Sequence, residues 1–304
     1  MSYAVAVVGL GAMGMGAAKS CIKAGIDTYG VDLNPQARET LKAAGARDAA
    51  ATADAFADRL DAVLLLVVNA AQVKAVLFGD GGEDQGLACR LKPGTAVMVS
   101  STISAEDARS IAARLAEHAV LMLDAPVSGG AAKASLGEMT VMASGSSEAF
   151  SRLEPVLSAV AGKVYNVGPD IGQGATVKIV HQLLAGVHIA AAAEAMALAA
   201  RAGIPLDLMY DVVTHAAGNS WMFENRMKHV VEGDYTPLSM VDIFVKDLGL
   251  VSDTAKSLRF PLPLASTALN MFTEASNAGH GREDDSAVIK IFSGIDLPKQ
   301  GEAS

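Results

Sequence analysis

The chain has 304 residues, of which 51% are hydrophobic and 19% charged, with a net charge of −9 and a pI near 5.1. This length suits one large domain or two ordinary ones, with enough apolar side chains for a sizeable core. The negative charge argues against nucleic acid or an anionic membrane as a partner. A local positive site would still allow a small anionic substrate.

The two cysteines, Cys21 and Cys89, form neither a disulfide framework nor a metal-binding spacing, so we expect reduced thiols and no metal site. The first residues lack the basic region of a signal peptide. The longest nearly apolar run, residues 179–193, is shorter than a membrane span and contains His181 and Gln182. The sequence therefore predicts a cytoplasmic protein.

The first half alternates short Val-rich runs with helical patterns. The runs predicted as strands are Val5–Val8, Thr28–Val31, Ala62–Val68, Ala96–Ser100 and Val120–Asp124. They are continuously apolar, as in a sheet buried on both faces. Helix starts are indicated at Asn34-Pro35 and at Ser104. This alternation predicts an α/β, Rossmann-type, doubly wound parallel sheet. Met139–Ala143 and Val164–Val167 are expected to add edge strands.

The pattern becomes helical after Gly168-Pro169. One long helix is predicted from Gly172 to about Ala202. Further helices are predicted over Pro205–His215, Trp221–Glu232, Ser239–Ser257, Leu264–Asn277 and Asp284–Phe292. We therefore expect a nucleotide-binding domain over residues 1–170 and an all-α domain over residues 171–304, which the long helix joins. The cleft between two such domains is a natural ligand site.

A glycine-rich turn follows the first predicted strand. Gly9, Gly11 and Gly14 have the GxGxxG spacing of a dinucleotide-binding turn, which brings a pyrophosphate to the N-terminus of the next helix. The residues predicted to line the cofactor here are Gly9, Leu10, Gly11, Ala12, Met13 and Gly14. The alternative is a glycine-rich turn without a ligand, but the position between strand and helix favours the cofactor.

Asp32 ends the second predicted strand, 18 residues after Gly14. A carboxylate at this position accepts hydrogen bonds from a ribose 2′-hydroxyl and repels a 2′-phosphate. No arginine follows in Leu33-Asn34-Pro35. The sequence therefore favours NAD over NADP as the cofactor.

Two further strand ends carry hydroxyl and glycine residues. Ser128, Gly129 and Gly130 follow the fifth predicted strand and offer a hydroxyl with exposed N–H groups, which suits a carboxylate. Thr102 follows the fourth strand at the same edge of the sheet, where ligands bind in such folds. Taken alone, the Ser-Gly-Gly segment is equally typical of a structural turn, and Thr102 is more typical of a cap or turn residue than of a ligand site.

Lys178 lies near the start of the long apolar helix, with no other full charge until Glu194. At about 100° per residue, Lys178, His181 and Gln182 share one face of this helix. A buried lysine costs desolvation energy unless it has a partner or a function, and burial favours its neutral form. We therefore predict that Lys178 exchanges a proton with a substrate hydroxyl.

Four motifs together resemble the β-hydroxyacid dehydrogenase family, which includes 3-hydroxyisobutyrate dehydrogenase and tartronate semialdehyde reductase. They are GLGAMG at 9–14, DAPVSGG at 124–130, GQGATVK at 172–178 and KDLGL at 246–250. The resemblance covers nearly the whole chain.

The resemblance implies a role for each matching residue. Ser128, Gly129 and Gly130 would hold the substrate carboxylate, Lys178 would be the catalytic acid/base, and Lys246 would lie near the nicotinamide. The family's cofactor-binding positions correspond to Thr102, Val68 and Gln72. The resemblance also implies a homodimer or homotetramer formed through the helical domain.

One motif departs from the family pattern at two positions, because Lys-x-x-Asn-Asn is replaced here by Lys178-Ile-Val-His181-Gln182. This variant looks like the branch that contains L-threonate dehydrogenase, which oxidises a polyhydroxylated four-carbon acid. Asn219, Ser220 and Asp242 are candidates for additional substrate contacts or for ordinary caps and surface residues. The other possibilities are a 3-hydroxyisobutyrate or tartronate semialdehyde enzyme, and a dinucleotide-binding scaffold without activity.

Overall fold

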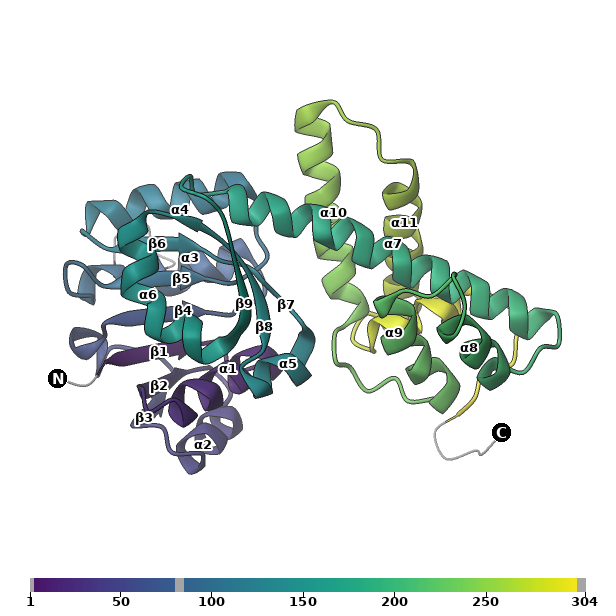
Figure 1. Ribbon diagram of the computed structural model, residues 1–304, viewed down its shortest axis with the longest axis horizontal. Helices are drawn as coiled ribbons and strands as arrows, with labels where there is room; N and C mark the ends of the chain where they lie inside the picture. Colours follow the sequence, from purple (N-terminus) through teal and green to yellow (C-terminus); the bar gives the residue numbers. More distant parts are fainter. Residues whose placement is uncertain (1–2, 80–84, 300–304) are drawn as a thin grey trace. The chain divides into compact units, whose positions relative to one another are not determined.

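The computed structural model describes residues 3–79 and 85–299 and divides into two compact units, Met1–Lys178 and Ile179–Ser304 (Figure 1). The boundary falls within one long helix, α7 (Gln173–Arg201). The first unit is built on a sheet, and the second unit is helical.

A nine-stranded sheet forms the first unit, in the order β3-β2-β1-β4-β5-β6-β8-β7, with β9 also paired to β8. Its strands are β1 (Ala4–Val8), β2 (Asp27–Val31), β3 (Asp48–Ala50), β4 (Ala62–Leu65), β5 (Ala96–Val99), β6 (Leu121–Asp124), β7 (Val127–Ser128), β8 (Met139–Gly145) and β9 (Ala161–Gly168). The first six strands in this order are parallel, which confirms the predicted Rossmann-type fold.

The far part of the sheet corrects the prediction that Met139–Ala143 is an edge strand. It belongs to β8, which pairs antiparallel with β6 and β7 on one side and parallel with β9 on the other. Six of the seven β8 residues are buried, whereas β9 has none that is buried. The apolar run of β8 shows that the faces of this strand are buried, but its interior position in the sheet comes from its pairing with β6, β7 and β9.

Helices cover both faces of the sheet (Figure 1). The helices of this unit are α1 (Ala12–Lys23), α2 (Pro35–Ala43), α3 (Ala70–Phe78), α4 (Ala105–Glu117), α5 (Gly130–Leu136) and α6 (Ser147–Val160), with short 3-10 turns η1 (Ala57–Arg59) and η2 (Ala88–Arg90). The helix starts predicted at Asn34 and Ser104 are confirmed, since each side chain accepts a hydrogen bond from the first turn of its helix. The short strands β3 and β7 and the helix α5 were not predicted.

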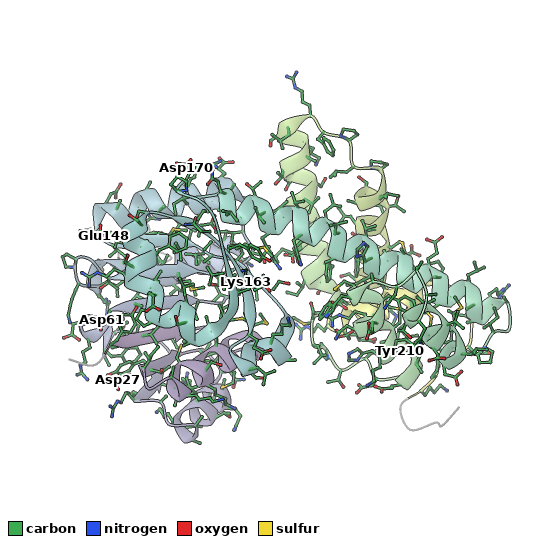
Figure 2. All side chains as sticks on the ribbon, in the orientation of Figure 1. Asp27, Asp61, Glu148, Lys163, Asp170 and Tyr210 are labelled. Atoms are coloured by element: carbon green, nitrogen blue, oxygen red, sulfur yellow. The ribbon has the colours of Figure 1, made fainter. Side chains whose placement is uncertain are left out.

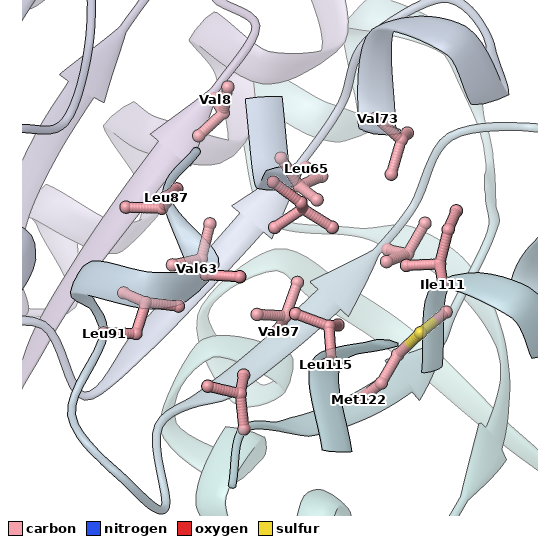
Figure 3. Packing of buried hydrophobic residues seen from close by; sticks show 14 of the residues in the cluster. Val8, Val63, Leu65, Val73, Leu87, Leu91, Val97, Ile111, Leu115 and Met122 are labelled. Carbon is pink, nitrogen blue, oxygen red and sulfur yellow. The ribbon is translucent and has the colours of Figure 1, made fainter. Parts of the chain in front are cut away.

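Alternate residues of each central strand enter different cores. Val63, Leu65 and Val97 pack with Val73 of α3 and Ile111 of α4 (Figure 3). The intervening strand residues pack with α1 and α6 on the other face. Strands buried on both faces must be apolar at every position, which explains the continuous runs in the sequence.

The second unit consists of helices around one apolar core. Besides most of α7, it contains α8 (Leu206–Thr214), α9 (Trp221–Glu232), α10 (Val241–Leu258), α11 (Pro263–Ala275), the π-helical segment η3 (Ser276–His280) and the 3-10 helix η4 (Asp285–Ile291). The predicted bounds of α9 are confirmed. The helix predicted over 284–292 is a 3-10 helix, with Asp284 capping its first turn.

The long helix α7 has apolar residues both on its buried side and on its exposed side. By length and composition it could cross a membrane, but half of its most apolar window is buried inside the protein. Charged side chains such as Glu148 and Asp170 project from the outside of the first unit (Figure 2).

Both cysteines are free thiols, as predicted, and burial raises the pKa of Cys21 to about 12.

Candidate cofactor and substrate site

The three glycines of the first turn have different surroundings. Gly9 has a φ of +88°, and a Cβ here would lie 2.6 Å from the carbonyl oxygen of Leu66. A Cβ on Gly14 would overlap the carbonyl oxygen of Gly9, so the helix α1 packs directly on the turn. A Cβ on Gly11, by contrast, would meet no atom within 4 Å. The turn therefore leaves open space at Gly11, which fits the close approach of a pyrophosphate.

Asp32 joins the end of β2 to this turn. One carboxylate oxygen accepts a hydrogen bond of 2.6 Å from the backbone N–H of Leu10, and the other accepts one of 2.7 Å from Asn34. The turn and the acid are thus held in one arrangement. The carboxylate lies where a Rossmann fold binds the adenosine ribose.

Arg38, six residues after Asp32, was not predicted to lie near the ribose site. Its guanidinium donates hydrogen bonds to the carbonyl oxygens of Asp32 and Leu33, at 2.9 and 3.3 Å. A signal for this contact exists in the sequence. Arg38 lies one turn into α2, and helical side chains lean toward the N-terminus. A cation therefore lies close to the predicted ribose site.

The loops after β4 and β5 place the next predicted residues. The backbone N–H of Val68 donates a hydrogen bond of 2.8 Å to the side-chain oxygen of Gln72, in the first turn of α3. Both residues are exposed. Thr102 lies in the loop after β5 and is half-buried, next to Ser101, whose hydroxyl accepts a hydrogen bond from Val67. The two loops are thereby tied together.

The Ser-Gly-Gly segment connects β7 to α5. Ser128 is the last residue of β7, and Gly129 and Gly130 follow with φ values of +123° and +68°. These conformations favour glycine. A Cβ on Gly130 would meet no atom within 4 Å, so the backbone is open on that side. The segment thus places the Ser128 hydroxyl beside a backbone that is open at Gly130.

Asp124, the last residue of β6, holds the start of α7. One of its carboxylate oxygens accepts hydrogen bonds of 2.9 Å from the N–H groups of Gly172 and Ala175. The hydroxyl of Ser144 donates to the same oxygen and accepts from Gly174. Burial raises the pKa of Asp124 above 3.8, although these hydrogen bonds oppose the shift. Lys178 follows within one turn and is buried, with 6% of its surface exposed.

The second unit contains a polar chain of four side chains. Gln182 donates from Nε2 to Oδ2 of Asp247 at 2.5 Å, and its Oε1 lies 3.0 Å from Nδ1 of His181. The ammonium of Lys246 lies 2.6 Å from the other oxygen of Asp247. The structure therefore brings together three predicted residues, His181, Gln182 and Lys246. Asp247 links them and was not predicted.

Three residues of the second unit were considered as additional substrate contacts, and each of them makes a hydrogen bond within that unit. Ser220 caps α9, since its hydroxyl accepts a hydrogen bond of 3.0 Å from Phe223. Asn219 donates to the carbonyl oxygen of Thr214. Asp242 accepts a hydrogen bond of 2.6 Å from Ser276. The interpretation of these residues as caps and structural contacts is favoured.

The predicted residues of the first unit follow the ends of its strands. The glycine turn follows β1, Asp32 follows β2 and Thr102 follows β5. Asp124, which was not predicted as a site residue, ends β6. Because these strands are parallel, their carboxyl ends share one edge of the sheet. Among residues 3–79 and 85–299, no group of three or more His, Cys, Asp or Glu side chains is arranged to hold a metal ion.

Comparison with known proteins identifies relatives along the whole chain. Residues 4–168 match a family model described as the NAD binding domain of 6-phosphogluconate dehydrogenase. Residues 172–292 match one described as NAD-binding of NADP-dependent 3-hydroxyisobutyrate dehydrogenase.

Individual relatives are similar over almost their full length. The chain is 74% identical to L-threonate dehydrogenase of Pectobacterium atrosepticum, over 99% of this chain and 98% of the relative. It is 72% identical to L-threonate dehydrogenase of Escherichia coli K12, over 97% of each. A crystal structure described as 3-hydroxyisobutyrate dehydrogenase from Salmonella typhimurium has a TM-score of 0.92 and 71% identity, over 96% of this chain and 100% of that one. The chain therefore belongs to the β-hydroxyacid dehydrogenase family and is a nicotinamide-dependent hydroxyacid dehydrogenase.

Proposed function

We propose that this enzyme oxidises L-threonate to the 2-oxo acid 2-dehydro-L-erythronate, with NAD as its cofactor. The observation that carries the reaction type is the buried Lys178, on a helix whose start is hydrogen-bonded to the end of β6. The substrate is supported by the His181-Gln182 pair and by the names of the relatives at 72–74% identity.

The residues proposed to hold the cofactor lie in the first unit, apart from Lys246. They are Gly9, Leu10, Gly11, Ala12, Met13, Gly14, Asp32, Val68, Gln72, Thr102 and Lys246. The open space at Gly11 and the oriented carboxylate of Asp32 fit a dinucleotide. Asp32 supports NAD, because a carboxylate repels a 2′-phosphate. Arg38 is the feature that would favour NADP, because its guanidinium contacts the two carbonyl groups through Nη1 and has further N–H donors.

The chain's own residues prepare the substrate for oxidation. Ser128, Gly129 and Gly130 bind the substrate carboxylate through the serine hydroxyl and backbone N–H groups. The neutral amine of Lys178 accepts the proton of the reacting substrate hydroxyl. The electron pair of that O–H bond then forms the new C=O bond of the product. NAD, held by the residues named above, would supply the acceptor for the hydride that leaves the same carbon. His181 and Gln182 lie within the next turn of the same helix and contribute to recognition of the remaining hydroxyl groups.

The second candidate function is oxidation of 3-hydroxyisobutyrate. The Salmonella typhimurium protein, at 71% identity, carries that description. Reduction of tartronate semialdehyde is a further alternative within the family. A scaffold that binds the cofactor without catalysis is disfavoured by Lys178, since such a protein has no need of a buried lysine.

We further propose a cytoplasmic homodimer or homotetramer formed through the helical unit. Val180, Leu184 and Leu198 lie along the exposed side of α7, each more than half exposed. An apolar surface of this kind is typical of a protein–protein contact. A second copy of the chain would cover it in a symmetric assembly. Within each copy of the chain, we propose that the two domains comprise residues 1–170 and 171–304.

An assay of NADH or NADPH formation tests the proposed substrate and the proposed cofactor together. Purified protein would be given NAD or NADP with L-threonate, D-threonate, 3-hydroxyisobutyrate or glycerate, and absorbance at the reduced nicotinamide band would be followed. The proposal expects turnover of L-threonate with NAD well above the other pairs. Preference for 3-hydroxyisobutyrate would instead select the second candidate. No turnover of any acid would support the scaffold.

A further inference from the structure

The orientation of the Gln182 side-chain amide follows from its neighbour. Its terminal group lies 2.5 Å from Oδ2 of Asp247, and a carboxylate can only accept hydrogen bonds. The atom facing Asp247 is therefore the amide nitrogen. Lys246, 2.6 Å from the other oxygen, stabilises the negative charge of Asp247. Gln182 and Asp247 are only 7% and 2% exposed, so water does not compete strongly for these contacts.

The fixed amide in turn determines the proton position on His181. With its nitrogen toward Asp247, Gln182 presents Oε1 to Nδ1 of His181 at 3.0 Å. An amide oxygen only accepts, so Nδ1 must carry the hydrogen. A neutral imidazole has one N–H, which leaves a lone pair on Nε2. Asp247 thus selects the Nδ1–H tautomer of His181 through its hydrogen bond with Gln182.

We infer that Asp247 is a positioning residue for substrate specificity, which makes Nε2 of His181 an acceptor for a non-reacting hydroxyl of the substrate. This inference rests on the proposed function, in which His181 recognises a polyhydroxylated acid. A hydroxyl of that substrate donates its hydrogen to Nε2. The opposite tautomer would offer an N–H there and would require an acceptor instead.

Nuclear magnetic resonance of the imidazole nitrogens tests the tautomer independently of activity. The intact protein would be labelled with ¹⁵N-histidine and measured near pH 8.5, above the usual histidine titration range. The chain has six histidines, and the signal absent from His181→Asn identifies the one of interest. We expect the wild-type protein to show protonated Nδ1 and unprotonated Nε2 at His181. Protonated Nε2 would overturn the inference.

Two substitutions test the positioning effect. Asp247→Asn can present either its oxygen or its nitrogen to Gln182, and Gln182→Met removes both contacts with little change in volume. In each variant we expect a mixture of His181 tautomers. The KM for L-threonate should rise about tenfold, the effect of one hydrogen bond, while kcat falls much less. The matched control is Asp253→Asn on the same helix α10, at an exposed position.

The outcomes separate the inference from the proposed function. A changed tautomer mixture with an unchanged KM would refute the role in specificity. An equal loss of kcat and no change in tautomer would assign Asp247 a different role and would also refute it. If wild-type protein with the expected tautomer turned over another hydroxy acid but not L-threonate, the proposed substrate would be wrong while the tautomer assignment stood.

Discussion

The carboxylate of Asp124 accepts a hydrogen bond of 2.9 Å from the backbone N–H of Ala175, three residues before Lys178. The same oxygen accepts from Gly172, so one strand end satisfies two N–H groups at the start of α7. A Cβ on Gly174 would lie 2.5 Å from the carbonyl oxygen of Asp124. Both glycines of the GQGATVK motif therefore allow close docking of the helix that carries Lys178.

Replacing Asp124 by alanine should reduce both stability and activity. Two buried N–H groups would lose their acceptor, at a cost of about 2 kcal/mol or more in the free energy of unfolding. Lys178 would be held less firmly, so kcat should fall as well. Urea unfolding and steady-state kinetics measure the two effects. The control is Ser146→Ala, which removes the cap of α6 and should lower stability by about 1 kcal/mol without a change in kcat.

The pH dependence of stability should reflect the raised pKa of Asp124. Burial is the main cause of the shift, so the folded protein holds this proton more tightly than the unfolded chain. Protonation of Asp124 therefore stabilises the folded protein. This contribution to the unfolding free energy is complete below the ordinary pKa of 3.8, and it is lost as pH rises through the pKa of Asp124 in the folded protein. The unfolding free energy of Asp124→Asn, minus that of the wild type, should therefore increase with pH across this range and then level. A decrease would show that the hydrogen bonds outweigh burial.

Two alanine substitutions in the glycine turn should have opposite consequences. Gly11 has a φ of −65° and open space around it, so Gly11→Ala should fold with unfolding free energy within about 0.5 kcal/mol of wild type. The added methyl group should weaken NAD binding by about tenfold or more, because it occupies the space of closest approach. Gly14→Ala should fail through instability instead, since its Cβ overlaps Gly9. Calorimetric unfolding and cofactor titration distinguish the two. Unimpaired NAD binding by Gly11→Ala would remove this turn from the cofactor site.

Lys178→Met should abolish most turnover while NAD binding persists. Methionine retains an unbranched side chain but offers no basic amine, and loss of a general base costs about 10²–10⁴ in rate. Stopped-flow kinetics and fluorescence titration with NADH measure the two properties. Lys163→Met, at an exposed position of β9, is the matched control and should leave both unchanged. Near-normal turnover in Lys178→Met would show that another group accepts the proton.

Substitutions on the exposed side of α7 test the proposed assembly. Leu184→Glu and Leu198→Glu place charges on a surface that a second copy would bury. Light scattering should show dimers or tetramers for the wild type and mainly monomers for these variants. Leu136→Glu on α5 changes an equally exposed leucine of the other unit and should keep the wild-type mass. A monomeric wild-type protein would contradict the proposal directly.

Local sequence patterns were sufficient to predict the type of each unit and several details within it. Continuous Val-rich runs specified the buried parallel strands, and the GxGxxG spacing specified the turn after β1. The N-caps at Asn34 and Ser104 were also predicted, as was α9, because caps and periodicity depend on residues a few positions apart. Lys178 stood out because a charge in an apolar helix is locally conspicuous.

The meeting of distant groups, in contrast, became visible only in the folded chain. Gln182 and Asp247 are 65 residues apart, and Asp124 and Ala175 are 51 apart, so no helix or strand period relates them. The interior place of β8 likewise depended on its pairing with β6, β7 and β9 rather than on its own residues. Local patterns record which face of an element is buried. The partner on that face is selected by the packing of the whole unit, because side-chain hydrogen bonds require both groups to arrive within about 3 Å.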